Sequence, residues 1–430
     1  MRSANGLVIA APRSGSGKTL VTLGLLAALR RRGLDVAPAK TGPDYIDAAI
    51  LTRVAGTPAI NLDPWAMSPM SLRHSAYVHG ANRDLLLVEG VMGLFDSAAD
   101  GRGSTADLAA ALKLPVILVV DADKQGQSIA AVVHGFASFR QDMEIAGVIL
   151  NRVATTRQER LLLDSLTPLG IPVLGALPRR ESLVVPERHL GLVLPGEVAT
   201  FDTTIAAAAE AVETYIDLNR LLALSAPLAV ASDSQPGRLP PLGQRISIAR
   251  DDAFSFTYQH LIADWQQAGA VISHFSPLAD EAPEMNSDAV LLPGGYPELH
   301  GERLSAAARF HAGLHAARDR GALIYGECGG YMVLGEELID GSGASHRMAS
   351  LLPIRTDISR PKRTLGYRRL SHHSPLPWPR DLLGHEFHYS AGNSGDPLFT
   401  ATDAIGTSLP PMGAIVGRVM GSYAHVIDAA

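Results

Sequence analysis

The sequence predicts an α/β protein of two doubly wound domains, each built on a mainly parallel sheet with helices on both faces. Short apolar runs typical of buried parallel strands alternate with helix-like segments in both halves of the chain. The length of 430 residues suits two or three domains, and a hydrophobic content of 47% is ample for their cores. These two observations carry the fold prediction.

The boundary between the domains is visible in the composition. An alanine-rich helix is expected over residues 203–219, and the stretch 225–243, with its Pro, Gly and Ser residues, has the composition of a linker. A new strand is expected at 245–249. We therefore predict an N-terminal domain over 1–224 and a C-terminal domain over 244–430.

The N-terminal domain opens with a phosphate-binding loop. An apolar run at 7–11 is followed by Pro-Arg-Ser-Gly-Ser-Gly-Lys-Thr and then by a helical pattern over 20–32. Glycines let backbone amides surround the phosphates, and the helix N-terminus adds its dipole. Lys18 is expected to reach the outer phosphates and Thr19 to hold Mg²⁺. A proline replaces the first glycine of the standard pattern.

Two later strand-like runs end near carboxylates. Residues 36–39 lead into Lys40, with Asp44 and Asp47 just beyond, and a buried run starting at residue 84 ends at Glu89. A carboxylate directly after a buried strand is costly unless it meets a cation. The strand ends of a phosphate-binding fold are where acids for the metal are expected.

The only cysteine, Cys328, lies where a β-prone run meets two glycines and a helix-like segment over 331–338. This is the pattern of a nucleophile elbow, in which small neighbours leave backbone amides open to a developing oxyanion. The alternative is a buried cysteine that acts as a small hydrophobe. A thiol with a pKa near 8.5 needs a base, and His425, after a β-like run over 413–419, is the candidate.

Three C-terminal segments, 326–330, 291–298 and 421–425, together resemble class I glutamine amidotransferase domains of the cobyric-type subgroup. The resemblance implies that Cys328 attacks the side-chain amide of glutamine and releases ammonia, with His425 as its base. By the same resemblance the candidate oxyanion donors are the amides of Gly295 and Gly329. The commoner family pattern His-Pro-Glu is replaced here by His425-Val426-Ile427-Asp428, so a Cys–His dyad is implied, and whether Asp428 or another carboxylate orients His425 stays open.

The N-terminal segments resemble dethiobiotin synthetase-like ATPases, and more closely the cobyrinic and hydrogenobyrinic acid a,c-diamide synthases. The resemblance implies that Thr19, Asp44 and Glu89 surround Mg²⁺, with Lys18 and Lys40 near phosphate. Three further polar side chains stay open: Asp47 and Asp96 as substrate-positioning groups or caps, and Asn151 as an adenine reader or a loop amide. The candidate ATP-binding residues are Ser14, Gly15, Ser16, Gly17, Lys18, Thr19, Lys40 and Asn151.

The family resemblance covers nearly the whole chain and implies a ligase of cobalamin biosynthesis. MgATP would activate the a and c carboxylates of a corrinoid polycarboxylate, and ammonia from glutamine would displace the phosphate. Whether the corrin ring carries cobalt stays open. The alternatives are another carboxylated tetrapyrrole as substrate, or a nucleotide-switch ATPase of the partitioning type with a degenerate C-terminal binding module.

Composition narrows the class of partner. A net charge of −6 and 19% charged residues leave no polybasic surface for nucleic acid. No apolar span approaches membrane length, and the N-terminus shows no signal-peptide pattern. A single cysteine suits a reducing cytoplasm. A homodimer is left open.

Two local clusters of charged or metal-binding residue types have alternatives to a functional role. The basic residues over 360–369 suit a solvated loop as well as an acidic substrate, and the histidines over 385–388 lack the further ligands that zinc needs.

Overall fold

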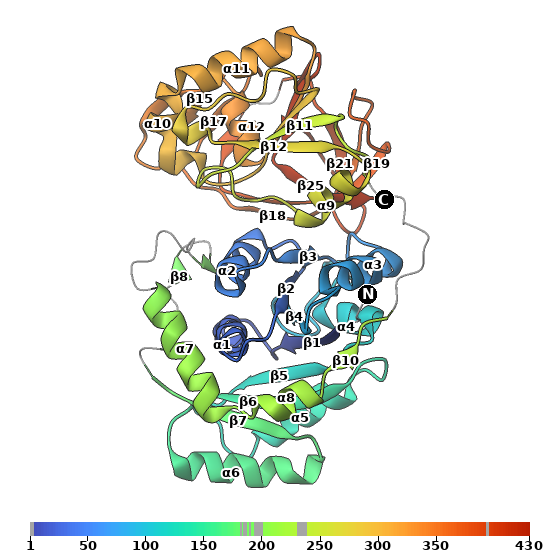
Figure 1. Cartoon of the computed structure of the whole chain (residues 1–430), viewed down its shortest axis with the longest axis vertical. Helices are drawn as coiled ribbons and strands as arrows, with labels where there is room; N and C mark the ends of the chain where they lie inside the picture. The colour runs from blue at the N-terminus through green and yellow to red at the C-terminus, as the bar shows by residue number, and fades with distance from the viewer. Residues whose placement is uncertain are drawn as a thin grey trace. The chain divides into compact units, whose positions relative to one another are not determined.

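A computed structural model describes residues 4–180, 183, 187–188, 191–192, 201–229, 239–392 and 395–430. The chain divides into two compact units, Met1–Ser97 with Gly101–Pro236, and Ala98–Asp100 with Gly237–Ala430 (Figure 1). Residues 230–238, which form the middle of the predicted linker, lie outside the described residues. The domain limits at 224 and 244 therefore stay predictions.

The first unit is built on a parallel sheet with the order β3-β2-β4-β1-β5-β6-β7. A short strand, β10 (Ala226–Pro227), adds antiparallel to β1. The central strands are buried along nearly their whole length, as expected for a sheet covered on both faces. The parallel strands are β1 (Asn5–Ala10), β2 (Val36–Thr41), β3 (Ile60–Leu62), β4 (Leu85–Glu89), β5 (Val116–Asp121), β6 (Ile145–Val153) and β7 (Val173–Pro178).

Helices cover both faces of this sheet. Figure 1 shows α1, α2 and α7 on one side of the strands and α3 and α4 on the other, and α1 packs on α7 so closely that a Cβ at Gly24 would lie 2.9 Å from the carbonyl oxygen of Ala208. The helices are α1 (Lys18–Arg31), α2 (Tyr45–Ala55), α3 (Pro69–Gly80), α4 (Thr105–Leu112), α5 (Ile129–Ser138), α6 (Thr156–Leu166), α7 (Phe201–Tyr215) and α8 (Leu218–Ala223), with a 3₁₀ turn at Thr167–Leu169.

The helix predicted over 203–219 is two helices. The chain breaks between α7 and α8 because the side chain of Asp217 accepts a hydrogen bond from the amide of Arg220 and so caps the start of α8. A small antiparallel pair, β8 (Glu187–Arg188) and β9 (Gly191–Leu192), lies between β7 and α7 in the sequence.

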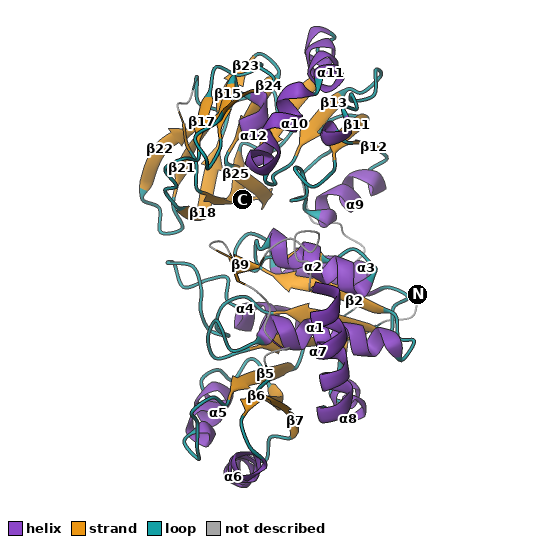
Figure 2. Cartoon of the chain, turned by 90° about the vertical axis from the view of Figure 1, so that its left-hand side faces the viewer, coloured by secondary structure: helices purple, strands orange, loops and turns teal. Residues whose placement is uncertain are grey.

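The second unit has a six-stranded sheet with the order β12-β11-β13-β14-β24-β23, parallel except for β23. Helix α12 packs on β13, β14 and β24, and α11 packs on β14 (Figure 2). The strands are β11 (Arg245–Ala249), β12 (Val271–Phe275), β13 (Ala289–Leu292), β14 (Leu323–Glu327), β23 (Ala414–Val416) and β24 (Val419–Ser422). The helices are α9 (Gln259–Gln267), α10 (Gly301–Ala306), α11 (Ala308–Asp319) and α12 (Gly329–Leu334), with 3₁₀ turns at Pro277–Ala279 and Pro297–His300.

Two further sheets, which local patterning did not predict, complete this unit. One has the order β22-β21-β18-β19-β25 and is antiparallel; the other has the order β16-β15-β17-β20. Their strands are β15 (Glu337–Ile339), β16 (Ser345–Arg347), β17 (Arg355–Asp357), β18 (Thr364–Ser371), β19 (Asp381–His388), β20 (Ala391–Gly392), β21 (Phe399–Thr402), β22 (Ser408–Met412) and β25 (Ala424–Ala429).

Two elements expected from the sequence of this unit differ in the structure. The helix predicted over 331–338 ends at Leu334, because Gly335 is extended and β15 begins at Glu337. The β-like run over 413–419 is the hairpin β23–β24, which turns at Gly417 with φ 61°.

Candidate functional site

The phosphate-binding loop joins β1 to α1 as predicted. Gly15 and Gly17 have φ angles of 78° and 88°, a region that glycine enters without a steric penalty. The amide of Asn151 donates to the carbonyl oxygen of Ser16 at 2.9 Å, and a Cβ on Gly17 would lie 2.1 Å from that same side-chain nitrogen. Asn151, near the end of β6, therefore contacts the loop through this hydrogen bond, and its role as an adenine reader stays a prediction.

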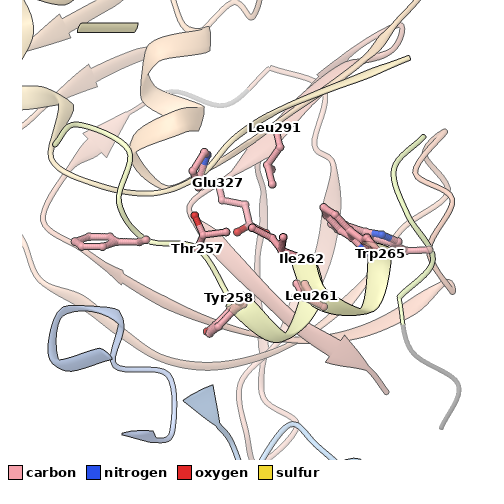
Figure 3. A pocket seen from close by; sticks show the side chains of 10 residues that line it. Thr257, Tyr258, Leu261, Ile262, Trp265, Leu291 and Glu327 are labelled. Atoms are coloured by element: carbon pink, nitrogen blue, oxygen red, sulfur yellow. The ribbon is translucent and has the colours of Figure 1, made fainter. Parts of the chain in front are cut away.

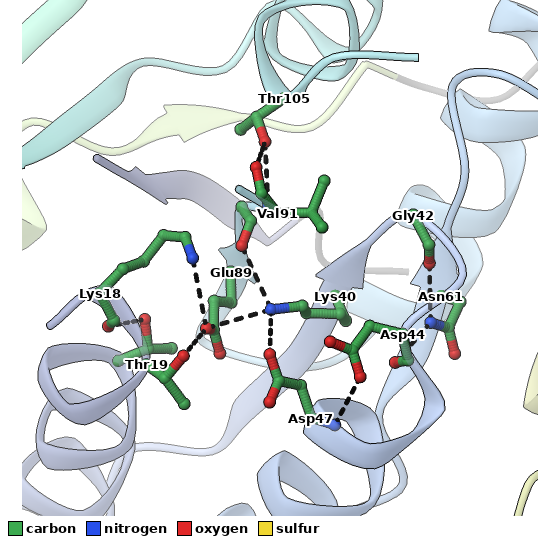
Figure 4. Close-up of polar contacts among 12 residues, drawn as sticks. Lys18, Thr19, Lys40, Gly42, Asp44, Asp47, Asn61, Glu89, Val91 and Thr105 are labelled. Carbon is green, nitrogen blue, oxygen red and sulfur yellow. Dashed lines mark hydrogen bonds and ion pairs between the residues drawn. The ribbon is translucent and has the colours of Figure 1, made fainter. Parts of the chain in front are cut away.

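A buried cluster of cations and acids lies beside this loop (Figure 4). The hydroxyl of Thr19 donates to Glu89 Oε1 at 2.5 Å, and the ammonium nitrogens of Lys40 and Lys18 lie 3.1 and 3.8 Å from that oxygen. Glu89 is fully buried, and its other oxygen, Oε2, has no hydrogen-bond partner in the described part of the chain. A hydroxyl and a free carboxylate oxygen are ligands of the kind that Mg²⁺ takes, with substrate oxygens and water completing the set.

Asp44 and Asp47 follow β2, and their surroundings shift the pKa values of the two carboxyl groups in opposite directions. Burial, and then the neighbouring Asp47, raise the pKa of Asp44 to about 7. Burial would also raise the pKa of Asp47, but its ion pair with Lys40 outweighs burial and lowers it. Asp44 also caps α2, because its side chain accepts from the amide of Asp47 at 2.9 Å. Asp47 is thus a charge partner of Lys40, and Asp44 is the acid whose charge is not balanced by so close a cation.

The remaining predicted acid, Asp96, is exposed and accepts from the amide of Gly93 at 2.7 Å, which closes the turn after β4. Its substrate role stays a prediction. Sequence reasoning missed Arg152, whose guanidinium donates to the Gly15 carbonyl oxygen and to Asp121, each at 2.9 Å. The signal was the position of Asp121 and Arg152 at two adjacent strand ends, which parallel pairing brings together.

Cys328 occupies a strained turn between β14 and α12. Its φ and ψ angles are 48° and −109°, outside the backbone regions that residues with a side chain normally adopt. Its backbone amide donates to the Ser422 carbonyl oxygen at 2.8 Å. A Cβ on Gly330 would lie 1.9 Å from the Leu292 carbonyl oxygen, so only glycine fits behind the turn. Burial, and then Glu298, raise the pKa of the thiol to about 12. The residue is placed as a nucleophile elbow predicts, and the free thiol holds its proton.

His425, on β25, lies beside Cys328 although 97 positions separate them in the sequence. A Cβ on Gly294 would lie 2.5 Å from His425 Cε1, 3.2 Å from His425 Nε2 and 3.2 Å from Cys328 Cβ. Gly294 therefore occupies the point where the two side chains meet. Burial, and then His385, lower the pKa of His425 to about 3, so its imidazole is neutral and has a nitrogen available as a base.

The two candidate oxyanion donors also come together. A Cβ on Gly329 would lie 3.1 Å from the backbone nitrogen of Gly295, and a Cβ on Gly295 would lie 2.0 Å from the Ala253 carbonyl oxygen. Backbone thus excludes a side chain at Gly295, and a Cβ on Gly329 would lie 2.7 Å from Pro297 Cδ. Two neighbouring amides next to the elbow are the arrangement that stabilises an oxyanion, and their assignment remains a prediction.

One carboxyl group near this centre was missed. Glu327 Oε1 accepts from the amide of Val426 at 3.1 Å, and Glu327 Oε2 lies 3.7 Å from His425 Nδ1. Burial raises the pKa of Glu327 to about 8, against the effect of hydrogen bonds from Val426 and Tyr325. A glutamate directly before the elbow cysteine was the available signal.

A buried polar group on β18 and β19 flanks the same centre. Arg368 pairs with Glu386, His388 lies 3.4 Å from Glu386, and His388 stacks on Tyr423 with ring centroids 4.1 Å apart. Arg368 therefore serves as a partner for Glu386, unlike the solvated basic loop expected from its sequence neighbours. No group of three or more His, Cys, Asp or Glu side chains among the described residues is arranged to hold a metal ion.

Comparison with known proteins gives a family for each half. Residues 7–193 match the model of the CobQ/CobB/MinD/ParA nucleotide binding domain, and residues 245–430 match that of the CobB/CobQ-like glutamine amidotransferase domain. In the part of the chain that the structure describes, every helix is too short or too polar to traverse a lipid bilayer.

Relatives match over nearly the full length. Hydrogenobyrinate a,c-diamide synthase of Brucella abortus is 52% identical over 429 residues, which cover 98% of both chains. The enzymes of that name from Rhizobium meliloti and Rhodobacter capsulatus are 50% and 48% identical, with coverage of 99% and 98% of both chains. The fold class and the resemblance read from the motifs are confirmed, and the chain belongs to the hydrogenobyrinate a,c-diamide synthase family.

Proposed function

We propose that this chain amidates the a and c side-chain carboxylates of hydrogenobyrinate, with ATP as the energy source and glutamine as the nitrogen donor, in cobalamin biosynthesis. The observation that carries the proposal is the presence in one chain of two reaction centres: a phosphate-binding loop beside Glu89, and a strained Cys328 beside His425. The names of relatives about half identical to this chain supply the substrate.

Activation of the carboxylate is assigned to the first unit. A carboxylate is a poor electrophile, so a phosphoryl group passes from ATP to a carboxylate oxygen and leaves an acyl phosphate and ADP. The amides of the loop and the ammonium groups of Lys18 and Lys40 balance phosphate charge. Thr19, Glu89 and Asp44 are the proposed Mg²⁺ ligands, and the ion would supply positive charge that offsets phosphate charge.

Ammonia production is assigned to the second unit. His425 takes the proton of Cys328, and the thiolate attacks the side-chain amide carbon of glutamine. The proton then passes to the leaving nitrogen, which departs as ammonia, and water hydrolyses the thioester to glutamate. Ammonia displaces phosphate from the acyl phosphate and forms the amide.

A nucleotide-switch ATPase is the alternative function, because the description of the family model matched by residues 7–193 includes MinD and ParA. The second model, matched over 245–430, favours the amide ligase because a switch has no use for a glutaminase.

Two substitutions test the proposal in one assay, in which amidation of hydrogenobyrinate is followed by mass, at about one unit lost per amide formed. Lys18→Ala should abolish amidation with glutamine and with ammonium salt, because the activation step loses its phosphate-reaching cation. Cys328→Ala should abolish glutamine hydrolysis and glutamine-dependent amidation yet retain the ammonium-dependent reaction. Full ammonium-dependent turnover in Lys18→Ala, or parental glutaminase in Cys328→Ala, would refute the corresponding half of the proposal.

A further inference from the structure

The glutaminase centre contains a carboxyl group that the family pattern does not supply. Where the commoner pattern has a glutamate two residues after the histidine, this chain has Ile427. Glu327 approaches the histidine from β14, a strand of another sheet, instead. It is the last residue of β14 and pairs in register with Ser422 of β24, three residues before His425.

The carboxyl of Glu327 is held in place by the backbone next to the histidine. Its Oε1 accepts from the Val426 amide at 3.1 Å, which leaves Oε2 at 3.7 Å from His425 Nδ1. The His425 and Glu327 side chains are 1% and 11% exposed, so water screens the pair little. In free enzymes such contacts are often long and shorten when substrate binds.

The ring of His425 is oriented for two partners. Its Cε1 and Nε2 atoms border the position next to Gly294 that Cys328 Cβ also borders, whereas Nδ1 is the atom nearest Glu327. A histidine that offers Nε2 to a nucleophile and Nδ1 to a carboxylate is the arrangement of a catalytic triad.

The electrostatic surroundings of Cys328 and His425 favour a group of this kind. Burial lowers the pKa of His425 to about 3 and raises the pKa of Cys328 to about 12, so neither residue alone favours transfer of the thiol proton to the imidazole. Ionised Glu327 beside the imidazole would offset that cost, and the imidazolium would in turn stabilise the ionised form of Glu327, whose pKa burial raises to about 8 in the free protein. The other side of Glu327 borders a largely apolar pocket of about 330 Å³, open solvent included, whose lining includes Leu261, Trp265 and Trp378 (Figure 3). This apolar lining contributes to the burial that raises the pKa of Glu327.

We propose that Glu327 is the positioning residue of the glutaminase centre: it fixes the tautomer and orientation of His425 through Nδ1 and balances the imidazolium formed when Nε2 takes the thiol proton. The inference rests on the proposed glutaminase function of the second unit. It assigns to Glu327 the task that Asp428 would have if the acid followed the histidine in sequence. The side chain of Asp428 accepts from the adjacent amide of Ala429 at 2.9 Å.

The test is Glu327→Gln, with Asp428→Asn as the matched control. Glutamine keeps the oxygen that accepts from Val426 but places an NH₂ group where Nδ1–H needs an acceptor, so the wrong tautomer is favoured. We expect kcat for glutamine hydrolysis to fall at least ~100-fold, by analogy with loss of a triad carboxylate, with KM within about threefold because the glutamine-binding groups are untouched. Asp428→Asn should retain parental kcat, and ammonium-dependent amidation should persist in both variants.

A second variant and a second readout keep the test decisive if Glu327→Gln is unstable. Glu327→Asp retains the charge, so it should recover part of kcat, which a purely structural role would not predict. The rate at which 6-diazo-5-oxo-L-norleucine labels Cys328 at saturation should follow kcat. Parental kcat in Glu327→Gln, or a loss carried by Asp428→Asn instead, would overturn the inference. The glutaminase assignment itself fails only if Cys328→Ala remains active.

Discussion

At the scale of single residues, the acids of the first unit differ in charge because their neighbours differ. Lys40 is fully buried, yet the carboxylates of Asp47 and Glu89 outweigh its burial and raise its pKa. Asp47 is kept ionised by that lysine. Asp44, one turn away and less closely paired, has its pKa raised to about 7. A carboxyl poised near neutral pH gains most from a divalent cation, since the ion stabilises its charged form.

This difference predicts a pH-dependent gain in stability for Asp44→Asn. A carboxyl whose folded pKa lies above its unfolded pKa of about 3.9 favours the folded state below that value and loses this contribution as pH rises through about 7. Asparagine caps a helix as well as aspartate and carries no charge. Without Mg²⁺, the variant should therefore gain more in Tm at pH 8 than at pH 5, while losing amidation. An equal change in Tm at both pH values would contradict the account.

At the scale of elements, α1 shows how a phosphate-binding loop is built. Glycines in the left-handed region stand at both its ends, Gly17 before it and Gly33 after it, with φ angles of 88° and 79°. The two differ in surroundings, because a Cβ at Gly17 would collide with the Asn151 side chain and a Cβ at Gly33 meets nothing within 4 Å.

The pair of substitutions Gly17→Ala and Gly33→Ala should separate strain from clash. Both should lose roughly 1 kcal/mol of stability because alanine resists the left-handed conformation. Only Gly17→Ala should also lose ATP affinity, since the loop must move away from Asn151. Equilibrium binding of an ATP analogue, with urea unfolding as the companion measurement, checks this. Equal ATP affinities in the two variants would show that the Asn151 contact does not shape the loop.

At the scale of the whole molecule, each unit has a hydrophobic core of its own. A chain of this kind need not unfold in one step, and a ligand stabilises the unit that binds it.

Calorimetry of the full chain should therefore resolve separate responses to the two ligands. A non-hydrolysable ATP analogue with Mg²⁺ at about 100 times its Kd should stabilise one transition by about 2.7 kcal/mol. Lys18→Ala should abolish that shift. Labelling of Cys328 with 6-diazo-5-oxo-L-norleucine should shift the other transition and leave the first unchanged. A single transition that both treatments shift equally would contradict independent units.

The features that the sequence alone determined are those encoded within short segments. The loop before α1 and the elbow at Cys328 were predictable because a strand, a run of small residues and a helix follow one another directly along the chain. The family followed from the same segments. The roles of individual site residues remain predictions.

Pairings between distant segments were decided only by the tertiary structure. The contact of Asn151 with the loop, the ion pair of Lys40 with Glu89 and the approach of Glu327 to His425 each join segments that are far apart in the sequence. The physical reason is that the order and register of strands in a sheet depend on packing across the whole unit. A strand's local sequence shows that it is buried, but its neighbours determine which charge lies beside it.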